Sequence, residues 1–403
     1  MVIGQRLTDF LGLRRDVVLL LGAIVLIGAG EETWMRFVPK YLEVLGASVF
    51  VIGIYDAIKT LLGALYAYPG GVLADAWGHR RALLAFTGLS LAGYATVLFV
   101  GHWAGILAGM FLFLAWSNLS LPALFSVVGR ALPAGKHAMG IGLQSLIKRL
   151  PIMVGPIAGG ILMDRLGLRA GFRAGVMLSI LCGLMALGLQ WRFEEEGAST
   201  LAPEWRLAGT VRAFSPGLRR LLLSDILIRF CERLPFGWVV IYAMDHLAMT
   251  ASQLGMLIAV EMATAAACYI PASHLSDRYG REPFVIATFV FFTLFPLTLL
   301  LARSFEVLLL AFVVRGLKEF GEPARKALII GLAPEPTRGR TIGAYYLIRD
   351  VVVTTGSFIG AALWAVGPAV NFWGASLFGA VGTVIYWARL HRGRIEPALR
   401  FRS

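Results

Sequence analysis

Acidic and basic side chains lie inside long apolar runs of this sequence. The stretch RGLKEFGEPARK, residues 315–326, separates the runs VLLLAFVV and ALIIGLA. An unpaired charge at the depth of a membrane costs on the order of 2.5–3.5 kcal/mol on insertion scales. Such side chains are therefore expected to face protein or water and to pair with one another. Carboxylates beside bases can exchange protons or hold a charged ligand.

The candidate residues of a cavity that binds substrate and protons are the ionisable ones expected at membrane depth. They are Glu31, Glu32, Arg36, Asp56, Lys59, Arg149, Asp225, Arg229, Glu232, Arg233, Glu261, Lys318, Glu319, Glu322, Arg325, Arg349 and Asp350. In a continuous helix, Arg315, Glu319, Glu322 and Lys326 would share one face, so local ion pairs are an alternative explanation. That alternative applies most to Arg315, Arg325 and Lys326, which lie nearer helix ends or can extend to the interface.

No other chemistry has a convincing set of residues. The six histidines lie in loops or at helix ends without the spacing of metal ligands. No glycine-rich phosphate loop ending in Lys-Ser/Thr occurs, which argues against ATP as the energy source. No pair of nucleophile and base is apparent, and the three cysteines are read as free thiols within apolar segments. We therefore expect no enzymatic activity, no cofactor and no metal.

The elements that position these charges are membrane-spanning helices. The chain is 58% hydrophobic and 15% charged, against about 25% charged in soluble domains. Apolar runs of roughly 20 residues, the length that spans a bilayer, recur throughout. Their approximate ranges are 17–44, 49–74, 82–101, 104–128, 138–163, 171–192, 219–245, 252–276, 283–302, 306–331, 340–364 and 369–390. The sequence thus predicts an all-α polytopic membrane protein with twelve transmembrane helices; the runs are too long for a β-barrel.

Basic residues are distributed unequally between the two sides of these helices. On one side the predicted loops hold only Lys40, Arg165, Arg169, Arg173 and Arg303, and most other basic loop residues lie on the side of the N-terminus. This is the positive-inside pattern, so both termini are expected in the cytoplasm. The net charge of +13 is explained by topology, and no nucleic-acid partner is expected. Residues 1–16 lack the features of a signal peptide.

The two halves of the chain resemble each other. The segment that begins at Pro122 aligns with the one at Pro323, a shift of 201, and the segment around Asp75 aligns with that around Asp277, a shift of 202. Under these shifts Lys59 corresponds to Glu261, and Arg149 to Asp350. We expect a bundle of six helices at 1–192, a cytoplasmic linker at 193–218, and a second bundle with a short tail at 219–403.

A motif between the second and third helices resembles the signature of the major facilitator superfamily (MFS). It reads GVLADAWGHRR here, and the second half has LSDRYGR at the equivalent place. The cytoplasmic gate residues that this resemblance implies are Gly71, Asp75, Gly78, Arg80, Arg81, Asp277, Arg278, Gly280 and Arg281. Ala76 stands where the family usually has a basic residue. The resemblance covers the whole chain and implies the MFS fold, two pseudo-symmetric bundles of six helices.

The fifth helix resembles the glycine-proline motif of the family's antiporters. Its residues here are Gly142, Gly155, Pro156, Gly159 and Gly160. Pro151 occupies the middle glycine position, and close packing of two helices is an alternative role for the motif. The fourth helix, 104–128, lacks the buried arginine common in proton-coupled drug exporters of the family.

These observations predict a secondary active transporter that moves a small molecule across the cytoplasmic (inner) membrane by alternating access. Proton-coupled export by antiport is the first expectation, and proton-coupled uptake of a polar or anionic metabolite is the alternative. A non-transporting membrane receptor or assembly partner ranks below both, because both gate aspartates are present. The expected partners are the substrate, protons and the lipid bilayer, with the protein acting as a monomer.

Overall fold

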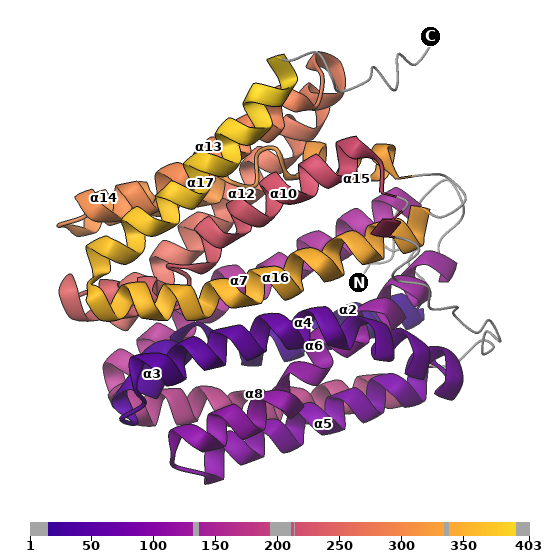
Figure 1. Cartoon of the computed structure of the whole chain (residues 1–403). Coiled ribbons are helices and arrows are strands. Elements are labelled where there is room, and N and C mark those ends of the chain that lie inside the picture. Colours follow the sequence, from indigo (N-terminus) through magenta and orange to yellow (C-terminus); the bar gives the residue numbers. More distant parts are fainter. Residues whose placement is uncertain (1–14, 132–136, 194–210, 213, 334–337, 392–403) are drawn as a thin grey trace. The chain divides into compact units, whose positions relative to one another are not determined.

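A computed structural model describes residues 15–131, 137–193, 211–212, 214–333 and 338–391 of the chain (Figure 1). The ordered elements within these ranges are all helical. Most of the expected linker at 193–218, and the tail from residue 392, lie outside them. Long helices are required because backbone polar groups inside a bilayer have no water to bond and must pair within their own segment.

The helices of the first half follow the predicted spans closely. They are α2 (Arg15–Glu31), η1 (Met35–Phe37), α3 (Val38–Val44), α4 (Val49–Trp77), α5 (His79–Phe99), α6 (Trp103–Ala131), α7 (His137–Leu166) and α8 (Leu168–Trp191). The first predicted span is thus a chain of three helical pieces, and the other five spans are single helices.

The helices of the second half repeat this pattern. They are α10 (Pro216–Arg233), α11 (Trp238–Ile241), η3 (Tyr242–His246), α12 (Ala251–Tyr279), α13 (Glu282–Leu301), α14 (Phe305–Leu317), α15 (Glu322–Leu332), α16 (Arg338–Val366) and α17 (Pro368–His391). Each of the twelve predicted spans therefore coincides with a helix or a run of helical pieces, as expected. Nine described segments are long and apolar enough to cross a membrane. The other three spans, at α7, α10–α11 and α14–α15, are charged or interrupted.

The described structure divides into two compact units. Unit 1 is Met1–Ala47, Leu62–Pro203 and Thr250–Ala259, and unit 2 is Ser48–Leu61, Glu204–Met249 and Val260–Ser403. Helices α4 and α12 each have one end in unit 1 and the other end in unit 2. In unit 1, α5 packs against α6 and α8, and α2 packs against α8. In unit 2, α10 and α13 both pack against α17.

Each unit has its own apolar core. Leu20, Phe86 and Trp116 are among the buried residues that join α2, α5 and α6 in unit 1. Phe289 and Tyr345 belong to the core of unit 2, which joins α10, α13, α15 and α16. The packing in these cores fixes the positions of the helices that carry the charged side chains.

Candidate functional site

Three of the spans are interrupted at the places where their charges are concentrated. Helix α2 ends at Glu31 and a turn follows, and α10 ends at Arg233 before another turn. These two ends are 202 residues apart, which is the shift of the internal repeat. The third interruption separates α14, which ends at Leu317, from α15, which begins at Glu322. Broken helices at membrane depth are tolerated where they line a cavity or contact protein, and transporters use them to bind substrates and ions.

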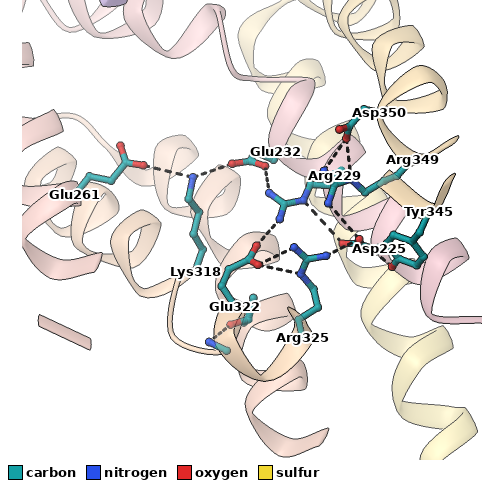
Figure 2. A network of polar contacts seen from close by, with 12 residues as sticks. Asp225, Arg229, Glu232, Glu261, Lys318, Glu322, Arg325, Tyr345, Arg349 and Asp350 are labelled. Atoms are coloured by element: carbon teal, nitrogen blue, oxygen red, sulfur yellow. Dashed lines mark hydrogen bonds and ion pairs between the residues drawn. The ribbon is translucent and has the colours of Figure 1, made fainter. Parts of the chain in front are cut away.

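The most buried part of the charge network in unit 2 is centred on Asp225 of α10 (Figure 2). Its Oδ2 accepts hydrogen bonds from Arg325 Nη1 at 2.6 Å and from the Tyr345 hydroxyl at 3.0 Å. Arg349 Nη1 lies 3.5 Å from the same oxygen. Glu322 accepts a hydrogen bond from Arg325 Nη2 at 2.7 Å and another from Arg229. Side chains thereby join three helices, α10, α15 and α16.

Lys318 lies at the start of the break between α14 and α15 and contacts two carboxylates. Its ammonium is 2.8 Å from Glu232 Oε1 and 3.4 Å from Glu261 Oε1. Arg315 Nε lies 3.1 Å from the same oxygen of Glu261. Arg229 Nη1 donates to the other oxygen of Glu232 at 2.7 Å. Each carboxylate is therefore shared between the lysine and one arginine.

A second polar group of unit 2 surrounds Asp56 in the first turns of α4. Arg233 Nη1 lies 3.4 Å from Asp56 Oδ1, and the hydroxyl of Ser357 donates to Oδ2 at 2.7 Å. Lys59, one turn further along α4, has its ammonium 5.9 Å from the centres of the Tyr55 and Phe236 rings. Asp56 therefore pairs with Arg233 and Lys59 lies near two aromatic rings, and their role in a cavity stays a prediction.

The candidate residues of unit 1 are held differently. Glu31 is 6% exposed, and its two oxygens accept hydrogen bonds from the Tyr94 hydroxyl at 2.6 Å and the Ser117 hydroxyl at 2.8 Å. Glu32 pairs with Arg36 Nε at 3.0 Å, one helical turn along. Neutral hydroxyl donors at Glu31 contrast with the guanidinium and ammonium donors around Asp225, Glu232 and Glu322.

Comparison with known families identifies the architecture that holds these charges. The family profile of the Major Facilitator Superfamily matches residues 20–228 and again residues 221–401. The chain belongs to the Major Facilitator Superfamily. It is a multi-pass membrane transport protein and not an enzyme.

Relatives of known name are transporters of the same superfamily. The protein is 26% identical over 361 residues to "Multidrug resistance protein MdtG" of Enterobacter lignolyticus, covering 84% of this chain and 83% of that one. It is also 26% identical over 389 residues to the MdtG of Proteus mirabilis, covering 90% and 91% of the two chains.

Solved structures of the superfamily have the same fold at low sequence identity. A POT family transporter in complex with 5-aminolevulinic acid superposes with a TM-score of 0.78 at 14% identity, over 94% of this chain and 96% of that one. A variant of the nucleoside transporter NupG gives 0.78 at 9% identity, over 94% and 100%.

The glycines of the fifth-helix motif pack against the turn that follows Glu31. A Cβ atom added at Gly159 would overlap the carbonyl oxygen of Thr33, and one at Gly155 would overlap Glu32. Gly160 packs in the same way against the backbone at Ala251 of α12. Pro156 and Gly142 lie in the same helix α7. The glycines of the motif therefore allow α7 to pack closely against the broken first span within unit 1. This packing role does not depend on the direction of transport.

The MFS signature forms tight turns at both of its copies. Gly78 has φ +85° and Gly280 has φ +92°, a conformation that favours glycine. Arg80 donates to the carbonyl oxygen of Trp191 at 2.6 Å and lies over its ring, and Arg281 donates to the carbonyl of Ala327 at 3.2 Å. The other two basic residues of the motif, Arg81 and Arg278, are exposed, and Gly71 lies within α4. The side chains of Asp75 and Asp277 lie outside the described part of the structure, so their gate role stays a prediction.

The prediction that the charges of the tenth span share one face of a continuous helix is wrong. Because α14 and α15 are separate helices, the spacing of a continuous helix does not apply across Lys318–Gly321. Arg315 pairs with Glu261, and Arg325 pairs within α15 with Glu322 at i, i+3. Glu319 lies within the break, and Lys326 is exposed, as its expected position near a helix end allows.

The remaining candidates are at the edges of the network. Asp350 pairs with its neighbour Arg349 at 2.7 Å, and Arg149 is half-buried in α7 of unit 1. The structure therefore joins in unit 2 most of the charges chosen from the sequence and leaves Glu31, Glu32, Arg36 and Arg149 in unit 1. Among the described residues, no group of His, Cys, Asp or Glu is arranged to hold a metal ion.

Sequence reasoning missed the neutral partners of the charges. Tyr94 and Ser117 bind Glu31, and Phe236, Phe292 and Phe295 line a small cavity beside Lys318. Apolar helices contain many such residues, so type alone does not single them out. The repeat does offer a signal, because Ser117 is equivalent to Lys318 and Tyr94 to Phe295 under the shift of 201.

Asp164, at the end of α7, was also missed. Its carboxylate accepts hydrogen bonds from the backbone amides of Ala251 at 2.9 Å and Ser252 at 3.0 Å, at the start of α12. It thus caps a helix to which it is not adjacent in sequence, and no local pattern reveals that.

Proposed function

We propose that this MFS protein exports a small molecule across the cytoplasmic membrane in exchange for protons, with both termini in the cytoplasm. The relatives named as multidrug resistance proteins support export. The glycine-proline motif of α7, which packs against the turn after Glu31, supports antiport by its resemblance to the family's antiporters. The charge network of unit 2 and the carboxylates of unit 1 supply groups for substrate and proton.

The observation that carries proton coupling is the environment of Glu31. Hydroxyl groups can donate and accept, so Tyr94 and Ser117 can bond to Glu31 in its ionised or protonated state. Arginine and lysine donate only, so the carboxylates of Glu232 and Glu322 are held in the ionised state by their partners. With these two hydroxyl partners, Glu31 can take up and release a proton as the cavity opens to either side.

Substrate-driven proton movement in liposomes tests this proposal. The purified protein is reconstituted with a pH-sensitive dye inside, and candidate amphiphiles (cationic, neutral and anionic) are added outside without a pH gradient. Antiport predicts that entry of a transported compound drives protons out, so that the lumen becomes more alkaline. Glu31→Gln is expected to abolish the proton signal while allowing exchange of labelled for unlabelled compound. Glu306→Gln, a change at an exposed carboxylate, is the matched control and should behave like the wild type.

Proton-coupled uptake is the second candidate. The basic groups Arg315 and Lys318 at the cavity of unit 2 favour it, because an anion that enters with a proton crosses with less net charge. The same liposome experiment separates the two, since symport would make the lumen more acidic. Proton movement that survives in Glu31→Gln would refute the role of that carboxylate in either direction.

A further inference from the structure

We infer that the substrate is an aromatic organic anion whose ring enters the cavity between α10, α13 and α14 and whose acid group binds Lys318. This inference names the substrate class of the transporter proposed above and so rests on that function. It is argued within unit 2, where the described side chains give a complete set of contacts.

The cavity combines aromatic rings with an excess of basic groups. Its lining residues are Glu232, Phe236, Phe292, Phe295, Arg315 and Lys318. Two cations therefore face one carboxylate and three phenyl rings. Sites for small molecules are mostly apolar with a few placed polar groups, and this lining has that composition. In this conformation the cavity has room for about one water molecule, so a ring enters only when the surrounding side chains move apart.

Lys318 can bind a further anion without leaving a carboxylate unpaired. An ammonium group has three N–H donors, and Glu232 and Glu261 are the two carboxylates in ion-pair distance of it among the described residues. If Lys318 turns toward a ligand, Glu232 keeps its hydrogen bond from Arg229 at 2.7 Å. Glu261 keeps its ion pair with Arg315 at 3.1 Å. The usual penalty for breaking a buried pair, a stranded charge, is therefore avoided.

The rings of the cavity already bind cations through their faces. The guanidinium of Arg315 lies 5.0 Å from the centre of the Phe295 ring and 5.7 Å from that of Phe236. The Lys318 ammonium lies 5.7 Å from the centre of the Phe292 ring. The rings therefore hold both cations at the cavity, where an acid group of a ligand can reach them.

The positions in unit 1 that are equivalent to Arg315 and Lys318 hold the uncharged residues Leu114 and Ser117. Under the shift of 201, Glu232 corresponds to Glu31, Lys318 to Ser117, and Phe295 to Tyr94. The contacts correspond as well: Ser117 donates to Glu31 at 2.8 Å, as Lys318 donates to Glu232 at 2.8 Å. The duplicated framework thus has neutral hydroxyls in one copy, and a cation with phenyl rings in the other. Anion recognition is therefore a specialised property of the second copy.

Binding of four one-ring probes to the purified protein in lipid nanodiscs tests the inference by calorimetry. They are phenylacetate, phenylacetamide, 2-phenylethylammonium and cyclohexylacetate. The first three share a phenyl ring and differ in charge, and the fourth keeps the negative charge but has a cyclohexyl ring in place of the phenyl ring. We expect phenylacetate to bind at least about tenfold more tightly than the amide or the ammonium, and measurably more tightly than cyclohexylacetate. Equal binding of amide and anion, preference for the ammonium, or no detectable binding of any probe would overturn the inference.

Variants locate the binding to the cavity. Lys318→Gln is expected to weaken phenylacetate to the level of phenylacetamide, whereas Lys326→Gln, at an exposed lysine eight residues along the chain, should leave the preference unchanged. Lys318→Arg should keep the preference for the anion. Phe295→Leu should narrow the difference between phenylacetate and cyclohexylacetate while the anion is still preferred, which covers the case that Lys318→Gln does not fold. A preference for the anion that survives in well-folded Lys318→Gln would refute the site.

This test uses no proton gradient, so its outcome is separate from that of the function proposed above. Anion binding without proton movement in liposomes would contradict proton coupling and leave the substrate class standing. Proton-coupled transport of cations alone would contradict the substrate class and leave proton coupling standing.

Discussion

At the scale of single residues, neighbouring side chains of this protein have opposite roles. Arg325 is 2% exposed and pairs with Asp225 at 2.6 Å and Glu322 at 2.7 Å, while Lys326 is exposed. Removing one partner of a buried ion pair strands the other charge and typically costs about 3–5 kcal/mol. We expect Arg325→Gln to destabilise the folded protein by about that amount, measured as thermal unfolding in nanodiscs.

Lys326→Gln is the matched control, because exposed substitutions usually change stability by only about ±0.5 kcal/mol. Equal stability of the two variants would contradict the ion-pair geometry. The sequence placed both residues near a helix end, although it named only Arg325 among the candidate cavity residues. What distinguishes them is Asp225, which is 100 positions away along the chain and comes close only after folding.

At the scale of elements, the interrupted helices explain where charges can be buried. The sequence predicted one continuous span at 306–331, but the chain breaks between Leu317 and Glu322. Pro323 removes a backbone donor at the start of α15, and a Cβ atom at Gly321 would overlap the carbonyl oxygen of Phe284. Hydropathy identified the length of the span correctly. It could not locate the break, because that depends on contact with α13.

The turn after Glu31 provides the test at this scale. A Cβ atom at Gly159 has no room, because it meets the backbone of Thr33 and not a movable side chain. We expect Gly159→Ala to destabilise the protein by about 1–3 kcal/mol, the usual cost of overpacking, and to reduce proton-coupled transport by shifting the turn. Thermal unfolding and the liposome assay measure the two effects.

Gly188→Ala in α8 of the same unit is the control for this change, since no atom lies within 4 Å of its added Cβ. It should be neutral or stabilising by up to about 1 kcal/mol, because alanine favours helix. Wild-type stability and transport in Gly159→Ala would show that α7 and the turn are not packed as described.

At the scale of the whole molecule, the internal duplication could be recognised from the sequence because two separate pairs of segments align with nearly the same shift, 201 and 202 residues. It predicted two similar bundles and the equivalence of Lys59 with Glu261, while the apolar runs predicted the twelve spans and the loop motifs predicted the family. It could not predict which charges meet, since ion pairs such as Arg229 with Glu322 join residues 93 positions apart. The repeat fixes where a residue lies on its helix, and the side chains of other helices decide its partner.

The orientation of the molecule follows from its basic loop residues and can be tested without a substrate. The positive-inside distribution predicts that the turn after α5, at Gly101, lies outside the cell and that the exposed Arg212 lies in the cytoplasm. We expect a membrane-impermeant maleimide to label Gly101→Cys in intact cells, and Arg212→Cys only after lysis. The parent chain is the background control, because Cys182 and Cys231 are buried and Cys268 lies within α12. Labelling of Arg212→Cys in intact cells would reverse the topology, and with it the direction of every transport step argued from the cytoplasmic side.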